Sequence, residues 1–262
     1  MSRGIHARMQ SASGPVRSRR HVRRRRLLPA LAIAALVAGA VVMVKLAARD
    51  RSDHPRTSVP GCVDGPVTPG IDVSYHQERI AWTKVRKAGI RFAFIRVSDG
   101  LTVVDPELGR NWEGAKRAGI LRGAYQFFRP EESATAQADQ LIDAIRRDPG
   151  ELRPVIDVEV TGGRSPEKLA AAIRVWVERV RSRRGVDPIV YTSPAFWRDH
   201  VRSDAFADLP LWVAHYTTSC PRVPAPWTRW TFWQHSKTGR VPGIKRDVDL
   251  NVFAGDIDAL RR

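Results

Sequence analysis

The chain has 262 residues, 43% of them hydrophobic, and a formal net charge of +17. This composition is that of a globular protein with a sizeable core, in one large domain or two small ones. The charge is uneven, because residues 1–61 hold 13 Lys and Arg against 2 Asp and Glu, so that +11 lies there and +6 remains for the rest. Most of the excess positive charge therefore lies in the N-terminal region. It does not indicate that the protein as a whole binds nucleic acid.

A basic cluster at residues 17–26 runs directly into an uncharged apolar stretch at residues 27–44. The 18 residues of that stretch are near the lower limit for a helix that spans a bilayer. Two interpretations stay open, an uncleaved anchor at residues 27–47 and a signal peptide removed on export; the length favours the anchor. Arginines that precede such a stretch stay in the cytoplasm, so residues 1–26 are expected inside and the domain outside, facing the cell wall.

Residues 48–61 are polar, charged and contain proline, which is typical of a flexible linker, and a single domain is expected over residues 62–262. The chain contains two cysteines, Cys62 and Cys220. An even number of cysteines in an exported chain permits a disulfide, which we expect because free thiols are a liability in an oxidising compartment. Two unpaired thiols are the alternative. The chain has no CxxC spacing, and the sequence indicates no metal site.

After residue 62, short apolar segments alternate with segments of helical periodicity. Taken in chain order, the strands are predicted at residues 70–76, 90–98, 120–128, 153–160, 187–193, 209–216, 230–236 and 247–253. The helices between them are predicted at residues 79–89, 106–119, 130–147, 165–185 and 194–201, with Ser165 as the N-cap of the fourth. Strands that alternate with helices in this way indicate βα units and a parallel sheet.

This order of elements predicts an α/β protein with an irregular β/α barrel similar to the TIM barrel. About eight strands over roughly 200 residues fit a closed barrel near the low end of its size range. The later helices are short or missing, so we expect irregularity in the second half. An open doubly wound sheet is the alternative. No GxGxxG follows the first strand, which argues against a dinucleotide, and no cofactor is expected.

The stretch RPVIDVEVTGG places two carboxylates, Asp157 and Glu159, in a segment that otherwise resembles a buried strand. Side chains alternate across a strand, so residues two apart share a face. Both acids also stand near the carboxyl end of the strand, where barrels carry their sites. Two close carboxylates repel, so one pKa should rise, as cleavage of a glycosidic bond requires. In the alternative, one acid pairs with an arginine and the other faces solvent.

Further acids stand at strand ends. Asp72 ends the first strand, and Asp247 and Asp249 lie in the last. The first and last strands are neighbours once a barrel closes, so these acids are expected to converge with Asp157 and Glu159 on one cleft. Aromatic residues that stack against sugar rings cluster at similar positions, although about half of them are expected in the core.

The order of these motifs resembles a known family. The segments are GIDVSYHQ, FAFIRVSDG, DPELGRNWEGAKRAGILRGAYQFF, PVIDVEV, PIVYTS, LPLWVAHY, WTFWQHS and GIKRDVDLNVF. Together they resemble the glycoside hydrolase family 25 lysozymes, the N-acetylmuramidases of the Chalaropsis type, from about Gly70 to Phe253. The resemblance implies an irregular β/α barrel with a groove for peptidoglycan.

The resemblance also implies residue roles. Glu159 is the general acid, and Asp157 stabilises the cationic transition state or intermediate. Asp72 and Asp249 are supporting aspartates, Asp249 being preferred to Asp247 because it directly precedes LN. The implied substrate-binding residues are Tyr75, Tyr125, Tyr191, Trp212 and Gln234. Two positions depart from the family pattern: Gln126 stands where histidine is common, and His235 where tyrosine is common.

The expected activity is hydrolysis of the β-1,4 bond between N-acetylmuramic acid and N-acetylglucosamine. A non-catalytic module that binds wall glycan on the same barrel is the alternative, but both members of the carboxylate pair are present. The expected partners are peptidoglycan strands and, through residues 27–47, the membrane. No nucleic-acid partner is expected, and the protein is expected to be a monomer.

Overall fold

A computed structural model of the protein describes residue 62, residues 65–217 and residues 219–260. The predicted basic head, anchor or signal segment, and linker lie outside these residues. Within the described ranges, no helix combines the length and the apolar character that a membrane crossing needs. The fold below is therefore that of the chain after the linker.

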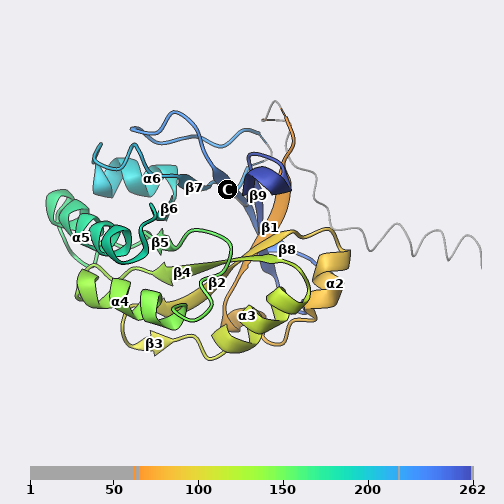
Figure 1. The fold of residues 1–262 in the computed structure, drawn as a ribbon. Helices are drawn as coiled ribbons and strands as arrows, with labels where there is room; N and C mark the ends of the chain where they lie inside the picture. Colours follow the sequence, from red (N-terminus) through yellow and green to blue (C-terminus); the bar gives the residue numbers. More distant parts are fainter. Residues whose placement is uncertain (1–61, 63–64, 218, 261–262) are drawn as a thin grey trace, which may run out of the picture. The chain divides into compact units, whose positions relative to one another are not determined.

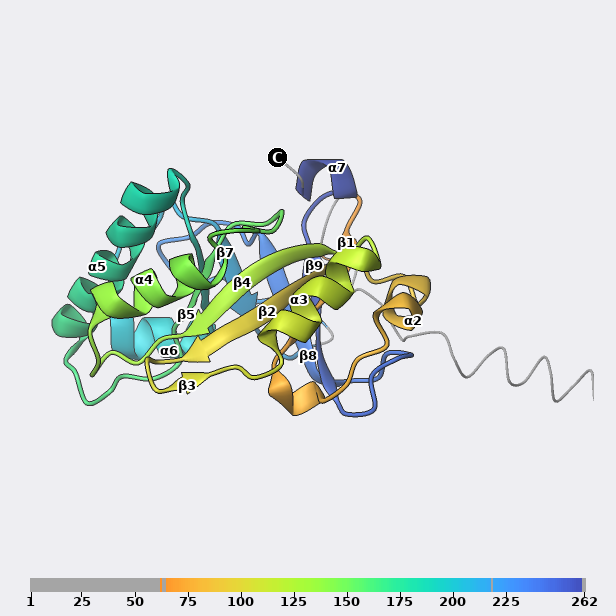
Figure 2. The same ribbon diagram turned by 60° about the horizontal axis from the view of Figure 1, so that its bottom comes forward.

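Eight of the described strands form a closed barrel, and a short ninth, β3, pairs with the carboxyl end of β2 at Ser98 and Asp99 (Figures 1 and 2). The strands are β1 Thr68–Val73, β2 Phe92–Asp99, β3 Val103–Val104, β4 Leu121–Phe127, β5 Val155–Asp157, β6 Ile189–Thr192, β7 Leu211–Ala214, β8 Phe232–Gly239 and β9 Val248–Phe253. Pairing of β1 with β2 closes the sheet. The barrel prediction is confirmed, and the open doubly wound sheet is wrong.

The direction of β9 departs from a regular barrel. β9 is antiparallel to both of its neighbours, β8 and β1. Every other pair of neighbouring strands in the barrel is parallel. A parallel connection needs a crossover of a dozen residues or more, usually helical. Only residues 240–247 separate β8 from β9, and they contain no helix. The short connection therefore turns the chain back, and the expected irregularity of the second half is confirmed.

The longer helices lie on the outside of the barrel, and several short ones lie at its ends or in its loops (Figure 1). They are η1 Tyr75–Gln77, α2 Trp82–Lys87, α3 Leu108–Arg117, α4 Ala134–Ala144, α5 Pro166–Arg184, α6 Pro194–Phe196, η2 Trp197–Val201 and α7 Ile257–Leu260. The hydroxyl of Ser165 accepts a hydrogen bond from the Lys168 N–H, so the predicted N-cap of α5 is confirmed. Gly185 ends α5 with a φ of 66°, which glycine adopts without strain.

Aromatic rings fill the middle of the barrel. Phe92 and Phe94 point inward from β2, each against a glycine of a neighbouring strand. A Cβ atom at Gly70 would lie 2.3 Å from the Phe92 ring, and one at Gly123 would lie 2.5 Å from the Phe94 ring, so only glycine fits at these two positions. Phe94 stacks in turn on Trp212, with ring centroids 4.4 Å apart. This packing blocks the barrel axis and separates its two ends.

Candidate active site

A pocket of about 190 Å³ lies at the end of the barrel where the parallel strands finish, which we call the carboxyl end. Eight residues predicted for the site line it: Asp72, Tyr125, Asp157, Glu159, Tyr191, Trp212, Gln234 and Asp249. Tyr75, also predicted, lies beside the pocket, with its ring 38% exposed. The structure therefore brings the predicted carboxylates together in one place.

Asp157 and Glu159 share a face, as the alternation predicts. β5 is shorter than predicted and ends at Asp157, but the backbone continues extended, because the Val158 N–H donates to the Tyr191 carbonyl at 2.9 Å. The Val158 carbonyl also accepts from the Thr192 hydroxyl at 3.0 Å. Val158 is packed in the core outside the barrel, so its two neighbours face the pocket. Asp157 is buried, whereas Glu159 is exposed to solvent.

The Asp157–Glu159 pair favours one shared proton. Burial raises the pKa of Asp157 well above its usual value, and the negative charges of Glu159 and Asp72 raise it further. Among the charged groups that act on Asp157, Glu159 has the largest effect. Asp157 therefore holds a proton more tightly than an exposed aspartic acid does.

Asp72 and Asp249 face each other across the β1–β9 ladder. The Asp72 carboxylate accepts hydrogen bonds from the amides of Gln234, at 2.8 Å, and Asn251, at 2.7 Å. These two bonds lower the pKa of Asp72, but burial has the larger effect and raises it to about 6. Burial and the charge of Asp72 raise the pKa of Asp249 to about 8. At neutral pH Asp249 is therefore mostly protonated and hydrogen-bonded to Asp72.

The two amides are themselves oriented by neighbouring donors. The carbonyl oxygen of Gln234 accepts from the hydroxyls of Tyr191 and Tyr216, both at 2.8 Å. The carbonyl oxygen of Asn251 accepts from the Trp212 indole N–H at 2.8 Å. Because each carbonyl is engaged, each NH₂ group is directed toward the Asp72 carboxylate. Sequence reasoning did not single out Asn251, although its position two residues after Asp249 places it on the same face of β9.

Three further residues are accounted for outside the pocket. Asp247 is exposed and pairs with Arg240 at 2.7 Å, which supports the choice of Asp249. Gln126 is buried on the helix side of β4, where its carbonyl accepts from the Trp176 indole at 2.9 Å. His235 likewise does not line the pocket. The two departures from the family pattern thus leave the carboxylate pocket intact.

Cys62 and Cys220 are free thiols in the structure, and a hydrogen bond between them accompanies burial in raising the pKa of Cys62 to about 11. The two side chains are therefore neighbours across a long stretch of sequence. The disulfide between them stays a prediction.

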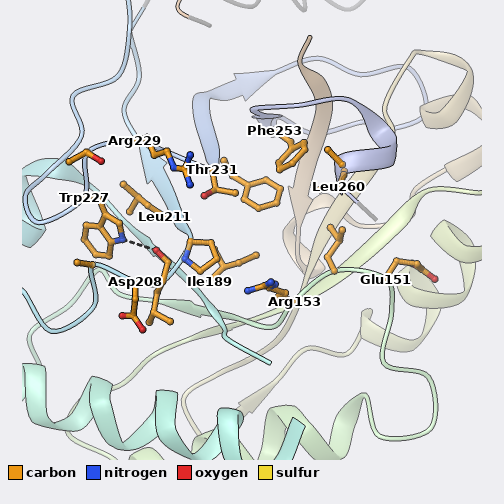
Figure 3. Close-up of a pocket in the computed structure, with 17 residues that line it drawn as sticks. Glu151, Arg153, Ile189, Asp208, Leu211, Trp227, Arg229, Thr231, Phe253 and Leu260 are labelled. Atoms are coloured by element: carbon orange, nitrogen blue, oxygen red, sulfur yellow. Dashed lines mark hydrogen bonds between the residues drawn. The ribbon is translucent and has the colours of Figure 1, made fainter. Parts of the chain in front are cut away.

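A larger cavity, of about 670 Å³, lies at the opposite end of the barrel, which we call the amino end (Figure 3). Its acids are already paired: Glu151 contacts Arg122 at 2.7 Å, and Asp208 contacts Arg181 at 2.6 Å. Their oxygens are thus engaged by guanidinium groups. The arrangement that suits acid catalysis is therefore at the carboxyl end, in the smaller pocket.

A β/α barrel with two adjacent carboxyl groups at the carboxyl end of one strand, one of them with a raised pKa, defines the class of a barrel-type glycoside hydrolase. The family model described as glycosyl hydrolases family 25 matches residues 71–244. The chain belongs to this family, and the resemblance inferred from its motifs is confirmed.

Two curated relatives and one solved structure are similar to most of this chain, and the second relative and the solved structure are lysozymes. YegX of Escherichia coli is 40% identical over 197 residues, covering 73% of this chain and 71% of that protein. Lysozyme M1 of Streptomyces globisporus is 39% identical over 198 residues, covering 71% of this chain and 67% of that protein. The crystal structure of the bacterial lysozyme from Streptomyces coelicolor superposes with a TM-score of 0.70 at 35% identity, covering 76% of this chain and 97% of that one. The protein is a glycoside hydrolase of the lysozyme class.

Proposed function

We propose that the protein hydrolyses the β-1,4 bond between N-acetylmuramic acid and N-acetylglucosamine in peptidoglycan, with Asp157 and Glu159 as its catalytic carboxyl groups. The observation that carries this assignment is the pair itself: a buried and an exposed carboxyl group, two residues apart, that line one pocket. Cleavage of a glycosidic bond needs one acid that protonates the leaving oxygen and one carboxylate that stabilises positive charge at the anomeric carbon.

The exposure of the two groups supports their division of labour. Glu159 is the solvent-facing member, so its carboxyl group is accessible to the leaving oxygen of a bound glycan strand and serves as the general acid. Asp157 lies deeper, beneath the sugar, where its negative charge stabilises the cationic transition state in a site that excludes water. In this working state the shared proton must be on Glu159, although burial favours a proton on Asp157.

The surrounding groups fit a supporting role. Asp72 carries negative charge at the pocket wall and is held in place by two amides. Asp249, neutral at pH 7, limits the accumulated charge to what the pocket tolerates. Tyr125 and Trp212 present aromatic surface to the same space and are proposed to contact the sugar rings.

A non-catalytic glycan-binding module is the second candidate. Binding alone gives no reason to bury three mutually repelling acids, Asp72, Asp157 and Asp249, in one pocket, because each raises the free energy of the folded state. Acids kept at such a cost are typical of catalytic sites.

Digestion of purified peptidoglycan tests the proposal. The wild-type chain from residue 62 onward is expected to release new reducing ends, which mass spectrometry should identify as N-acetylmuramic acid. Glu159→Gln should lower the rate by about 10²–10⁴-fold while peptidoglycan is still bound in a pull-down assay. Full activity in Glu159→Gln would remove the general acid assignment, and binding without any cleavage by the wild type would favour the non-catalytic module.

We also propose that the domain works outside the cytoplasm, anchored to the membrane by residues 27–47. The support is the sequence alone, a basic cluster followed by an apolar stretch. Fractionation of cells that express the full chain is the test. An anchored protein sediments with the membranes and stays there after a wash with high salt, whereas a cleaved one appears in the medium with its N-terminus removed.

A further inference from the structure

Arg96 has a position that sequence reasoning did not single out. It points inward from β2, is 8% exposed, and lines the carboxylate pocket. Among the described residues that line this pocket, no other is a lysine or an arginine. The buried guanidinium therefore places a permanent positive charge in the pocket, and this charge acts on Asp157.

An ion pair sets the orientation of the guanidinium group. The Arg96 Nε donates to Asp105 Oδ2 at 3.2 Å, and the Asp105 side chain is 1% exposed. Asp105 also accepts the N–H groups of Tyr75 and Glu107, each at 2.9 Å, so its oxygens are engaged. Arg96 lines the pocket and Asp105 does not. The positively charged member of the ion pair, Arg96, thus lies in the pocket with the acids, whereas the negatively charged member, Asp105, lies outside it.

Two buried polar atoms in this region have no hydrogen-bond partner within the described part of the chain: Arg96 Nη2 and Asp157 Oδ1. Both belong to residues that line the same pocket, one a donor and the other an acceptor. The ring of Tyr75 covers the guanidinium, with its centroid 4.8 Å from Cζ. An unpaired buried donor is costly, and its persistence beside an unpaired acceptor points to a role in the chemistry of the pocket.

We propose that Arg96 is a positioning residue that decides which carboxyl group of the Asp157–Glu159 pair holds the shared proton: its positive charge favours ionised Asp157 and thereby leaves the proton on Glu159. No bond to substrate is formed by Arg96 in this role, because it acts through Asp157. The inference rests on the proposed functions of Asp157 and Glu159.

The charges around Asp157 define what Arg96 opposes. The titratable residues that share the pocket with it are Asp72, His76, Arg96, Tyr125, Glu159, Tyr191 and Asp249. Burial, the charge of Glu159 and the charge of Asp72 raise the pKa of Asp157, whereas the charge of Arg96 lowers it. Without Arg96, the charges of Glu159 and Asp72 both favour the proton on Asp157, away from the leaving oxygen.

Two variants with opposite expected shifts test the proposal. Arg96→Met removes the charge, so kcat on peptidoglycan should fall at least tenfold with KM within about twofold, and the acidic limb of the pH–kcat profile should move to higher pH. Asp105→Asn removes the negative end of the ion pair and keeps the arginine, so the acidic limb should move to lower pH. Arg96→Lys is the matched control that keeps the charge, and its acidic limb should stay near that of the wild type.

A structural role alone predicts a different pattern. Both Arg96→Met and Asp105→Asn would then lose activity and thermal stability together, with no shift of the limb or with shifts in the same direction. That result in folded protein would overturn the proposal. If Arg96→Met does not fold, the acidic limbs of Asp105→Asn and Arg96→Lys are compared instead. The proposal then requires the acidic limb of Asp105→Asn to lie at lower pH than that of Arg96→Lys.

A readout without substrate separates this inference from the proposed function. The carboxyl titration of Asp157, followed by carbon-13 NMR and assigned with Asp157→Asn, should shift to higher pH in Arg96→Met and to lower pH in Asp105→Asn. Unmoved titration in both would refute the role of Arg96 even if the enzyme is active. Full activity in Asp157→Asn, with the titration shifted as expected, would refute the function of Asp157 and leave the charge effect of Arg96 standing.

Discussion

The two ends of the barrel both carry acids near a buried arginine, but the acids are held in opposite ways. At the amino end, Asp148 and Glu151 each bond the guanidinium of Arg122 at 2.7 Å, and Arg122 is buried. The bonds to Arg122 and Lys116 hold the pKa of Asp148 well below its usual range. Asp148 therefore stays ionised and contributes to stability.

At the carboxyl end, the acids bond amides and one another, and Arg96 makes its ion pair with Asp105, outside the pocket. Their pKa values are raised, mainly because burial is not offset by a direct cation. The partner of a carboxyl group, more than its presence, therefore separates a structural acid from one that can exchange protons. The predictions below test this contrast between the two ends.

The largest expected difference is in activity. Asp157→Asn should lower kcat on peptidoglycan by about 10²–10³-fold, because an uncharged amide no longer stabilises the transition state. Asp148→Asn, the same change at the amino end, should leave kcat per folded molecule within about twofold. Release of reducing ends, corrected for the folded fraction by circular dichroism, measures both. Equal losses in the two variants would show that the ends do not differ as described.

The order should reverse for stability. Asp148→Asn combined with Glu151→Gln leaves the buried charge of Arg122 without a compensating carboxylate, so the free energy of unfolding should fall by about 3–5 kcal/mol. Asp157→Asn removes a buried repulsion and should cost little or nothing. Urea unfolding followed by tryptophan fluorescence gives both values. Adding Arg122→Met to the double variant should recover part of the loss, because the unpaired charge is then gone.

The dependence of stability on pH should also differ between the ends. Asp249 has a folded pKa of about 8, above its unfolded value, so it binds a proton more tightly in the folded state. Its contribution to the free energy of unfolding is present at low pH and is lost as the pH rises from about 4 to about 8. Asp249→Asn, which keeps a donor to Asp72, should therefore be more stable than the wild type at pH 9, by on the order of a few kcal/mol, and similar to it at pH 4.

The contribution of Asp148 to the free energy of unfolding changes with pH in the opposite direction. Its folded pKa is lowered, so its contribution is present above the unfolded pKa and disappears as the pH falls below about 4. Thermal unfolding between pH 2 and pH 9 compares the two aspartates in one series. A wild-type profile that Asp249→Asn leaves unchanged at high pH would contradict the raised pKa of Asp249.

The smallest expected effect concerns the orientation of Gln234. Tyr191→Phe removes one of the two hydroxyls that donate to its carbonyl oxygen, which should cost about 0.5–1.5 kcal/mol of stability and a few-fold in kcat. Tyr216→Phe removes the other hydroxyl, from a ring 49% exposed to solvent, and should cost less. Urea unfolding and reducing-end assays of the two variants rank them. A larger loss in Tyr216→Phe would point to a direct contact between Tyr216 and the glycan.

Local chemistry made much of this protein predictable. The alternation of side chains along a strand is a property of two neighbouring peptide units, so the shared face of Asp157 and Glu159 follows from their spacing. The N-cap at Ser165 follows in the same way from a hydroxyl within reach of an N–H three residues on. The order of the motifs indicated the family, and the family resemblance in turn implied the barrel. The ends of β5 were predicted poorly, because the segment remains extended where strand pairing has ceased.

Other features depend on residues that only the folded chain brings together. The amides that hold Asp72 come from positions 162 and 179 residues away, and no local pattern reveals such pairings. The same holds for the direction of β9, the place of Arg96 in the pocket of Asp157, and the raised pKa of Asp249. The sequence by itself determined which side chains share a face and which ends of strands carry acids. Tertiary structure alone decided which acids meet an arginine and which meet each other, because burial and charge act through space, whatever the separation along the chain.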